Sequence, residues 1–550
     1  MRSTTLVALG LCSCALAGVT VQEPGLKVPA QYQSNRAAAE KIFTTSYNAY
    51  KEFAFGHDEL LPISKTSEDD LGGWGASIVD AMTTMLVMGL DDLFNEALNF
   101  SSHIDFSVIP AGGTISVFET TIRFVGGLLS AFELSGQQHP ILVAKAKQVA
   151  DKMAFAWIGD NVLPYGHIDF SDNSPDIAVT NIAEAGTLSL EWFKLSKFTG
   201  NATYGDLTMK SVEFIANLPA PLPGLAARFI DPGTGQFDGA YVGWGGGSDS
   251  YFEYLLKYAR LTNTNNNIFI DTWKTAIDSS IHTLLKTSTV GNHAYLADQD
   301  DQGLIRHVGS HLACFYAGNW LLGGKLLNNQ TIINIALQLN DGCWNTYAGT
   351  TTGIGPEGFA FISSDGNFTG DTITADEIAF YNTHGFYITS SDYIQRPEGK
   401  HLGRLLESNF YAWRVTGDTK YLDRAASAIA SFNKFLPPPD HVGFASLNDV
   451  NNATAGFIDV MESFWYENFE RKDITYSQFE NRFAEVLKYL YLTFDDPSHI
   501  SLDNYVFNTE CHPFKAPPAL NSYAGSGKLI PQKPFNAHKT GSPLPAISPR

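Results

Sequence analysis

The chain has 550 residues, of which 44% are hydrophobic, 13% aromatic and 17% charged, a composition that excludes an intrinsically disordered protein. Its formal net charge of -21 at pH 7 argues against nucleic acid and anionic membranes as the main partners. Neutral ligands and cations are therefore the favoured partners.

The N-terminus has the pattern of a secretory signal peptide. The segment MRSTTLVALGLCSCALAG places one arginine before an apolar run that ends in small residues, so we assign residues 1–18 to the signal. No later segment approaches 18 uninterrupted apolar residues, so we expect no membrane span and a protein that is secreted or held in a vesicle lumen. Five N-x-S/T sequons agree with this route: Asn99, Asn201, Asn329, Asn367 and Asn452.

Removal of the signal leaves three cysteines. Cys314 and Cys343 are neighbours along the chain, and a bridge between them would close a loop worth about 3 to 4 kcal/mol in the chain-entropy model. Cys511 would then remain a thiol. Because the three cysteines form no CxxC motif or Cys/His group, we expect no zinc site.

Between residues 36 and 515 one pattern recurs loosely: an apolar helix, a short turn rich in Thr, Ser, Gly, Asn or Asp, and a second helix. In chain order it occupies residues 82–100, 129–153, 190–215, 254–277, 314–339, 409–432 and 487–502. The uneven spacing argues against a solenoid. We expect an all-α toroid of about seven helical hairpins in one domain, followed by a flexible Pro-, Gly- and Ser-rich tail over residues 516–550.

Acidic residues beside Gly, Pro or aromatic groups are spread along the chain, and a ring would bring them to one mouth. Carboxylates that share a confined cavity shift each other's pKa values apart, which lets one act as an acid while another stays ionised. These residues are Asp80, Glu119, Glu184, Asp249, Glu253, Glu357, Glu398, Glu407, Glu462 and Glu510.

Glu119 and Arg123 are of particular interest because they lie in an otherwise apolar stretch. Their i,i+4 spacing places them on one helix face. A solvated surface pair is one interpretation, and an inward-facing pair at the mouth of the ring is the other.

Eleven collinear blocks carry a resemblance to a known family. They are GGWGASIVDAM, SVFETTIRFVGGLLSAFELSG, IAEAGTLSLEW, GGGSDSYFEYLLK, HLACF, GIGPEGF, YIQRPE, LESNFYAWRVTGD, MESFW, FAEVLKYLYL and YVFNTECHP. The chain resembles the class I α-1,2-mannosidases, glycoside hydrolase family 47, and among them the secreted fungal enzymes. This resemblance implies a monomeric (α/α)7 barrel over residues 36–515, plugged at one end. It also implies Ca²⁺-dependent trimming of α-1,2-linked mannose from high-mannose N-glycans, from nine mannoses to five, with inversion.

The resemblance further implies roles for individual residues. Glu119, Asp249 and Glu357 match carboxylates linked to proton donation, and Glu398 matches the proposed general base. Thr509 matches the threonine that binds Ca²⁺ through its hydroxyl and carbonyl oxygens, which are hard ligands suited to this ion. The residues that match binders of sugar hydroxyls or calcium waters are Arg123, Glu253, Arg396, Glu407, Glu462 and Glu510.

Two other functions stay open. Another α/α-toroid glycosidase or lyase would have carboxylates without the NTE block around Thr509. A non-catalytic relative would bind mannose without cleaving it, although the presence of every carboxylate by type favours catalysis.

Two segments depart from the family pattern. Residues 399–405 separate Glu398 from Glu407, and residues 466–482 separate MESFW from FAEVLKYLYL. Both interrupt expected inner helices, and the second is polar and charged. We expect either segments that loop out and spare the site, or translated intron remnants that put later side chains out of register and weaken the product.

Overall fold

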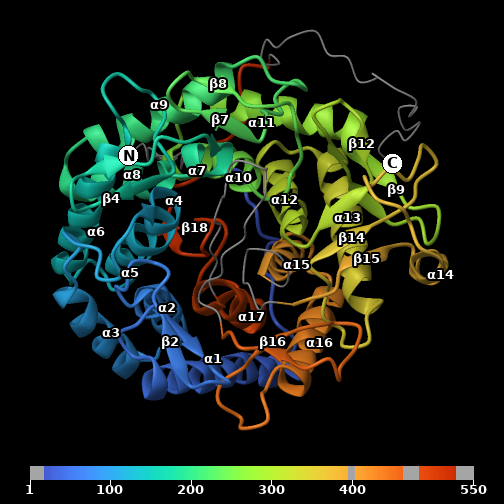
Figure 1. Ribbon diagram of the computed structural model, residues 1–550, viewed down its shortest axis with the longest axis horizontal. Helices are drawn as coiled ribbons and strands as arrows, with labels where there is room; N and C mark the ends of the chain where they lie inside the picture. The colour runs from blue at the N-terminus through green and yellow to red at the C-terminus, as the bar shows by residue number, and fades with distance from the viewer. Residues whose placement is uncertain (1–17, 394–402, 462–481, 528–550) are drawn as a thin grey trace, which may run out of the picture.

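The computed structural model describes residues 18–393, 403–461 and 482–527 and forms a closed ring of helices (Figure 1). Each inner helix packs against the next, and the last packs against the first, so the ring closes. The inner helices are α2 (Ala76–Met88), α5 (Gly126–Leu134), α8 (Ser189–Thr199), α10 (Asp249–Thr262), α12 (Tyr316–Leu326), α15 (Gly403–Thr416) and α17 (Leu487–Phe494).

A second layer of helices wraps the inner ring, and each outer helix packs against at least one inner helix. The expected toroid is therefore confirmed, with seven helix pairs among the described residues. The hairpin expected over residues 487–502 is wrong, because this stretch holds only α17, which pairs with α1 (Gln33–Phe53) from the other end of the chain. The outer helices are α1 (Gln33–Phe53), α3 (Asp91–His103), α6 (Pro140–Met153), α9 (Thr203–Asn217), α11 (Ile268–Ser279), α13 (Gln330–Ala348) and α16 (Lys420–Phe435).

The two layers differ in how much of each helix is buried. In the outer helix α3 only Phe94, Ala97 and Ser101 are buried, the i, i+3, i+7 stripe of a helix with one solvated face. In the inner helix α10 every residue from Asp249 to Leu261 is buried. Charged residues on the inner helices are therefore held inside the protein.

Short antiparallel sheets precede the inner helices in the chain and lie at one end of the ring. The strands are β1 (Glu59–Leu61), β2 (Thr66–Glu68), β3 (Ile115–Ser116), β4 (His167–Asp169), β5 (Ser174–Pro175), β6 (Thr180–Asn181), β7 (Phe229–Asp231), β8 (Gln236–Phe237), β9 (Leu285–Thr287), β10 (Ala294–Leu296), β11 (Asp298–Gln299), β12 (Ile305–Arg306), β13 (Val308–Ser310), β14 (Gly358–Ala360), β15 (Tyr387–Ser390), β16 (Ser446–Leu447) and β17 (Phe457–Ile458). We call this end of the ring the mouth.

Several shorter helices complete the fold. They are η1 (Ala30–Tyr32), α4 (Val117–Thr120), η2 (Thr121–Val125), η3 (Ala154–Ala156), α7 (Ile182–Gly186), η4 (Ser280–Leu284), η5 (Leu312–Phe315), α14 (Ala375–His384) and η6 (Arg482–Val486). Of these, η2, η4 and η6 are π-helical turns. Such turns are uncommon and occur often at functional sites.

A hairpin near the C-terminus occupies the centre of the ring, where β18 is drawn in red (Figure 1). It pairs β18 (Tyr505–Phe507) with β19 (Pro513–Lys515). The Asn508 side chain organises the turn, since its Oδ1 accepts hydrogen bonds from the backbone N–H of Glu510 at 3.0 Å and of His512 at 2.8 Å. We call residues 508–512 the hairpin tip.

The two ends of the described chain meet. Arg414, on the inner helix α15, donates to the side-chain oxygen of Gln22 at 2.5 Å, and Val19 N–H donates to the carbonyl of Leu520 at 2.9 Å. Residues 516–526, which the sequence assigns to the tail, lie along α10 and α11 through bonds such as Asn263 Nδ2 to the Pro518 carbonyl at 2.8 Å.

The expected disulfide is confirmed. It joins Cys314 on η5 to Cys343 on α13, with Cα atoms 6.0 Å apart, and Cys511 is a buried thiol. All five sequon asparagines are exposed. Within the described ranges, we find no helix that combines the length and apolar character needed to cross a membrane.

Candidate active site

Arg123 binds three carboxylates from distant parts of the chain. Its Nε donates to Glu119 at 3.0 Å, one terminal nitrogen donates to Glu510 at 2.7 Å, and the same nitrogen lies 3.8 Å from Asp80. All four side chains are at most 1% exposed. We call these four residues the arginine cluster. The interpretation of Glu119 and Arg123 as a surface pair is therefore wrong.

The local sequence positions this pair. Ser116 caps α4 by accepting the backbone N–H of Glu119 at 3.2 Å, and the chain then widens into the π-helical turn η2, which carries Arg123. Glu119 and Arg123 still meet across this turn.

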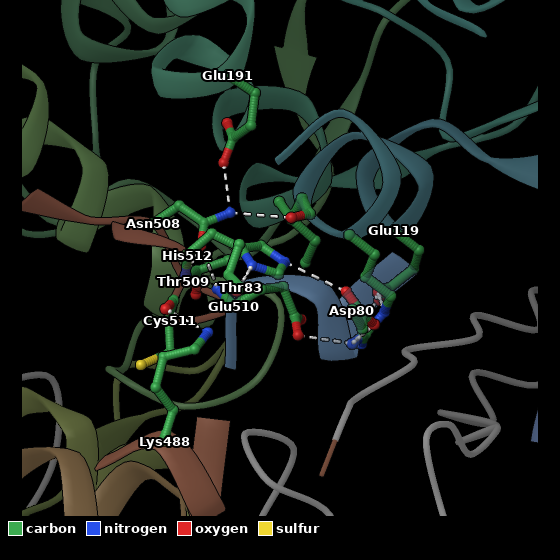
Figure 2. Close-up of polar contacts among 12 residues, drawn as sticks. Asp80, Thr83, Glu119, Glu191, Lys488, Asn508, Thr509, Glu510, Cys511 and His512 are labelled. Atoms are coloured by element: carbon green, nitrogen blue, oxygen red, sulfur yellow. Dashed lines mark hydrogen bonds and ion pairs between the residues drawn. The ribbon is translucent and has the colours of Figure 1, made fainter. Parts of the chain in front are cut away.

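His512 connects the hairpin tip to α2. Its Nε2 lies 3.2 Å from an Asp80 oxygen and its Nδ1 lies 2.9 Å from the Thr83 hydroxyl (Figure 2). Burial raises the pKa of Asp80 well above its usual range, against the opposing effect of Arg123. Burial, together with the positive charges of Lys488 and Arg123, lowers the pKa of His512 well below its usual range. Burial therefore favours the uncharged form of both groups.

Other inner helices hold the hairpin tip from further sides. Asn508 Nδ2 donates to a Glu191 oxygen at 2.8 Å, and Lys488 donates to the Cys511 carbonyl at 2.7 Å (Figure 2). The Tyr254 hydroxyl donates to the same Glu191 oxygen at 2.6 Å. Burial raises the pKa of Glu191 to about 7, although its hydrogen bonds oppose this. Helices α2, α8, α10 and α17 and the η2 turn thus converge on one tip.

A second group of charges joins α10 to α15. Lys257 pairs with Glu253 one turn earlier and lies 3.4 Å from a Glu407 oxygen, which also accepts from the Tyr489 hydroxyl at 3.0 Å. We call Glu253, Lys257 and Glu407 the lysine cluster. Burial alone would lower the pKa of Lys257, but Glu253, then Tyr411 and then Glu407 raise it well above its usual range.

Asp249 and Glu357 lie toward the mouth. Asp249 begins α10 and precedes Glu253 by one turn, so both share a helix face with Lys257. Glu357 precedes β14 and lines a cavity of about 300 Å³ together with Gly245 and Gly246, in the loop that leads to Asp249. Asp249 and Glu357 are each 6% exposed.

The structure therefore brings together most of the expected residues, in two clusters and a cavity. Thr509, at 1% exposure, lies in the hairpin tip, and its N–H donates to the Tyr254 hydroxyl at 3.2 Å. Three expected site residues, Arg396, Glu398 and Glu462, lie outside the described residues.

Helices are present at the C-terminal ends of the two unusual segments. α15 begins at Gly403 and η6 at Arg482. Glu407 lies 3.4 Å from Lys257 on α10, and the effect of residues 399–405 on the register stays a prediction. The origin of residues 466–482 stays a hypothesis, since residues 466–481 are outside the described part of the chain.

Sequence reasoning missed two buried carboxylates, Glu191 and Glu485. Glu191 contacts the hairpin tip, and Glu485, on the π-helical turn η6, is fully buried with no hydrogen-bond partner for either oxygen among the described residues. Both lie within matched blocks, LSLEW and FAEVL. Glu191 lies in α8, separate from the helix α7 that carries Glu184, so helical spacing from Glu184 gives no signal for it.

Comparison with known proteins decides the family. The model of glycosyl hydrolase family 47 matches residues 42–516. The chain belongs to glycosyl hydrolase family 47. Its match contains both clusters and the hairpin tip, and the (α/α)7 barrel expected from the resemblance to family 47 is confirmed.

Relatives of known name cover nearly the whole chain. Mannosyl-oligosaccharide alpha-1,2-mannosidase 1B of Aspergillus phoenicis is 36% identical in an alignment 536 residues long that covers 93% of this chain and 98% of the relative. Mannosyl-oligosaccharide alpha-1,2-mannosidase of Coccidioides posadasii is 35% identical over 88% of this chain and 91% of its own. The solved structure of alpha-1,2-mannosidase from Trichoderma reesei superposes with a TM-score of 0.80 and 34% identity, covering 88% of this chain and 99% of that one.

Proposed function

We propose that this protein is an inverting, Ca²⁺-dependent α-1,2-mannosidase that trims high-mannose N-glycans. The observation that carries the proposal is the arginine cluster inside a family 47 barrel. In this cluster the Arg123 guanidinium pairs with Glu119, the candidate acid, and with Glu510 of the hairpin tip.

In this proposal Glu119 delivers a proton to the leaving oxygen, with Asp249 or Glu357 assisting, and Glu398 activates the attacking water. Arg123 orients Glu119 through the hydrogen bond from its Nε. Inversion requires room for a water between the base and the sugar. The first-formed product would be β-mannose.

The residues at the hairpin tip fit a calcium ion. No group of three or more His, Cys, Asp or Glu side chains within the described ranges is arranged to hold a metal. A site built on Thr509 oxygens and water does not require such a group. Glu485 lies one turn before Lys488, which donates to the Cys511 carbonyl of the hairpin tip. A buried carboxylate with no hydrogen bond among the described residues is costly unless a cation or water compensates it, so Glu485 is consistent with a bound cation. When bound, the ion would supply a hard positive charge that orders oxygen ligands.

We also propose that the protein enters the secretory pathway and carries N-glycans. The signal-like N-terminus, the disulfide and the five exposed sequons support this proposal. Its partners would be glycoproteins with high-mannose glycans, met in a vesicle lumen or outside the cell.

Mannose release from the disaccharide Man-α-1,2-Man tests the activity, and proton NMR of the first product tests inversion. We expect activity to be lost with a chelator and restored by Ca²⁺. Thr509→Ala should weaken calcium binding and lower thermal stability, because a ligand that binds only the folded state stabilises it. Full activity of a protein shown to contain no calcium would contradict the metal assignment, and α-mannose as first product would contradict inversion.

A further inference from the structure

The cavity at the mouth contains a charged group that the proposed chemistry does not use. Its volume of about 300 Å³ lies at the lower end of the range of small-molecule sites, roughly 300 to 1,000 Å³. Besides Glu357, its lining includes Arg228, Tyr241 and Asp298. We call the last three residues the mouth platform.

The mouth platform fixes a guanidinium group in place. The guanidinium carbon of Arg228 lies 4.1 Å from the centroid of the Tyr241 ring, and the Tyr241 hydroxyl donates to Asp298 at 2.7 Å. Arg228 lies 4.0 Å from that Asp298 oxygen, and the two charged side chains are 13% and 18% exposed. Stacking and charge therefore both restrain Arg228 beside the cavity.

The backbone restrains Arg228 as well. Its N–H donates to the Tyr241 carbonyl at 2.9 Å, and its own carbonyl accepts from Ile182 N–H at 2.9 Å. Gly247, with φ of +82°, leaves room for the arginine stem, because a Cβ atom there would lie 3.1 Å from Arg228 Cγ. Arg228 is thus preorganised, which reduces the entropy lost when a ligand binds.

We propose that Arg228 is a specificity-determining residue that binds hydroxyl groups of the mannose residues on the reducing side of the cleaved bond, beyond the first one, which the disaccharide Man-α-1,2-Man also contains. This assignment rests on the α-1,2-mannosidase activity proposed above. The released mannose must reach the carboxylates around the hairpin tip, so the rest of the glycan extends toward the mouth. A guanidinium presents paired N–H donors that suit neighbouring sugar hydroxyls.

Arg424 provides a matched control. It also lies beside aromatic rings, 5.3 Å from the Trp344 centroid, pairs with Asp341 at 2.7 Å and is 14% exposed. It does not line this cavity. Arg228→Leu and Arg424→Leu therefore remove the same kind of stacked, paired arginine from two places.

The test compares kcat/KM for Man-α-1,2-Man with kcat/KM for a nine-mannose N-glycan. We expect Arg228→Leu to lower the ratio of glycan to disaccharide roughly tenfold, through KM, as loss of a charged hydrogen bond predicts. Arg228→Lys should fall between, and Arg424→Leu should leave the ratio unchanged. The order in which glycan isomers appear should change only with Arg228.

A ratio within twofold of the wild type in Arg228→Leu would overturn the assignment, whether or not both rates fall. Binding separates this result from failure of the proposed function. In a Glu119→Gln background, Arg228→Leu should weaken binding of the nine-mannose glycan roughly tenfold. If the wild-type protein cleaves neither substrate but Arg228→Leu still weakens glycan binding, the proposed activity is refuted and Arg228 is supported as a glycan contact. If Arg228→Leu and its parent bind the glycan equally, the role of Arg228 in binding is refuted.

Discussion

The arginine cluster and the lysine cluster are both buried, yet they connect different parts of the molecule. Arg123 joins its own helical segment to α2 and to the hairpin tip through Glu510. Lys257 joins α10 to α15 through Glu253 and Glu407. The arginine cluster therefore attaches the central hairpin, which plugs the ring, to the inner helices. The lysine cluster attaches one inner helix to another.

The two clusters therefore differ in whether they contact residues of the candidate active site. Removing one partner of a buried pair leaves an uncompensated charge in both clusters. Only in the arginine cluster does the loss reach both the candidate acid, Glu119, and the tip that carries Thr509.

The largest expected effect is on turnover. Glu119→Gln should lower kcat about 1,000-fold, within the range attributed to general acid catalysis, because the amide cannot deliver a proton. Glu133→Gln is the matched control, since Glu133 also pairs with a buried cation, Lys194, at 2.8 Å. Glu133 has no role in the proposed reaction. We expect its kcat to stay within a few-fold of wild type in steady-state assays on Man-α-1,2-Man. Equal losses in both variants would contradict the role of Glu119.

Replacing each central cation would sharpen the comparison itself. Arg123→Met and Lys257→Met should each reduce the free energy of unfolding by about 3 to 5 kcal/mol, measured by urea denaturation. Hydrogen exchange of residues 505–515 should accelerate in Arg123→Met, because Glu510 loses its cation, and should change less in Lys257→Met. The same acceleration in both variants would show that the two clusters act as one network.

Glu191 allows a test of pH dependence at the hairpin tip. Its pKa of about 7 in the folded protein exceeds the value of about 4.3 for an exposed glutamate, so the native state binds the proton more tightly. Stability should therefore fall as pH rises from about 5 to 7, by up to about 3 kcal/mol from this group. Glu191→Gln should remove this part of the dependence of stability on pH. Compared with the wild type, the variant should therefore lose less stability between pH 5 and pH 8, as measured by urea denaturation at both pH values. Parallel slopes for variant and wild type would refute the raised pKa.

The smallest expected effect concerns residues 466–482, which precede Glu485, Lys488 and Tyr489. If this segment is an intron remnant, deleting it should raise soluble yield and activity at least about twofold, because Lys488 and Tyr489 contribute one bond each to the tip and to the lysine cluster. Yield and specific activity of the two chains are the measurements. Lower activity after deletion, or transcripts that retain the segment beside a fully active chain, would contradict the hypothesis.

The fold was predictable because its signal is local. Each hairpin shows an apolar run, a polar turn and a second run, and the disulfide joins neighbouring cysteines. The site was predictable in residue type, since a ring must gather acids such as Glu119 and Glu510 from distant positions.

The partners inside the site were not predictable from the sequence. Lys257 and Glu407 are 150 residues apart, and nothing local distinguishes their charges from those of a solvated helix face. Glu485 lies on a π-helical turn, which shifts the face that a regular 3.6-residue repeat would assign to it. The mouth platform combines two loop residues, Arg228 and Tyr241, with Asp298 at the start of β11, and spacing along the sequence does not relate the three.

The way the ring closes has a consequence for biosynthesis. The first long helix, α1, packs against the last, α17, and the hairpin tip comes from residues 508–512. A chain that emerges from the ribosome N-terminus first can form hairpins in succession, but it lacks the partner of α1 and the central plug until almost the whole chain has been made. During that interval the carboxylates that face the axis would lack their contacts with the central hairpin. Premature termination anywhere before residue 508 would therefore yield a polypeptide with an open ring or an unplugged axis, a natural substrate for quality control.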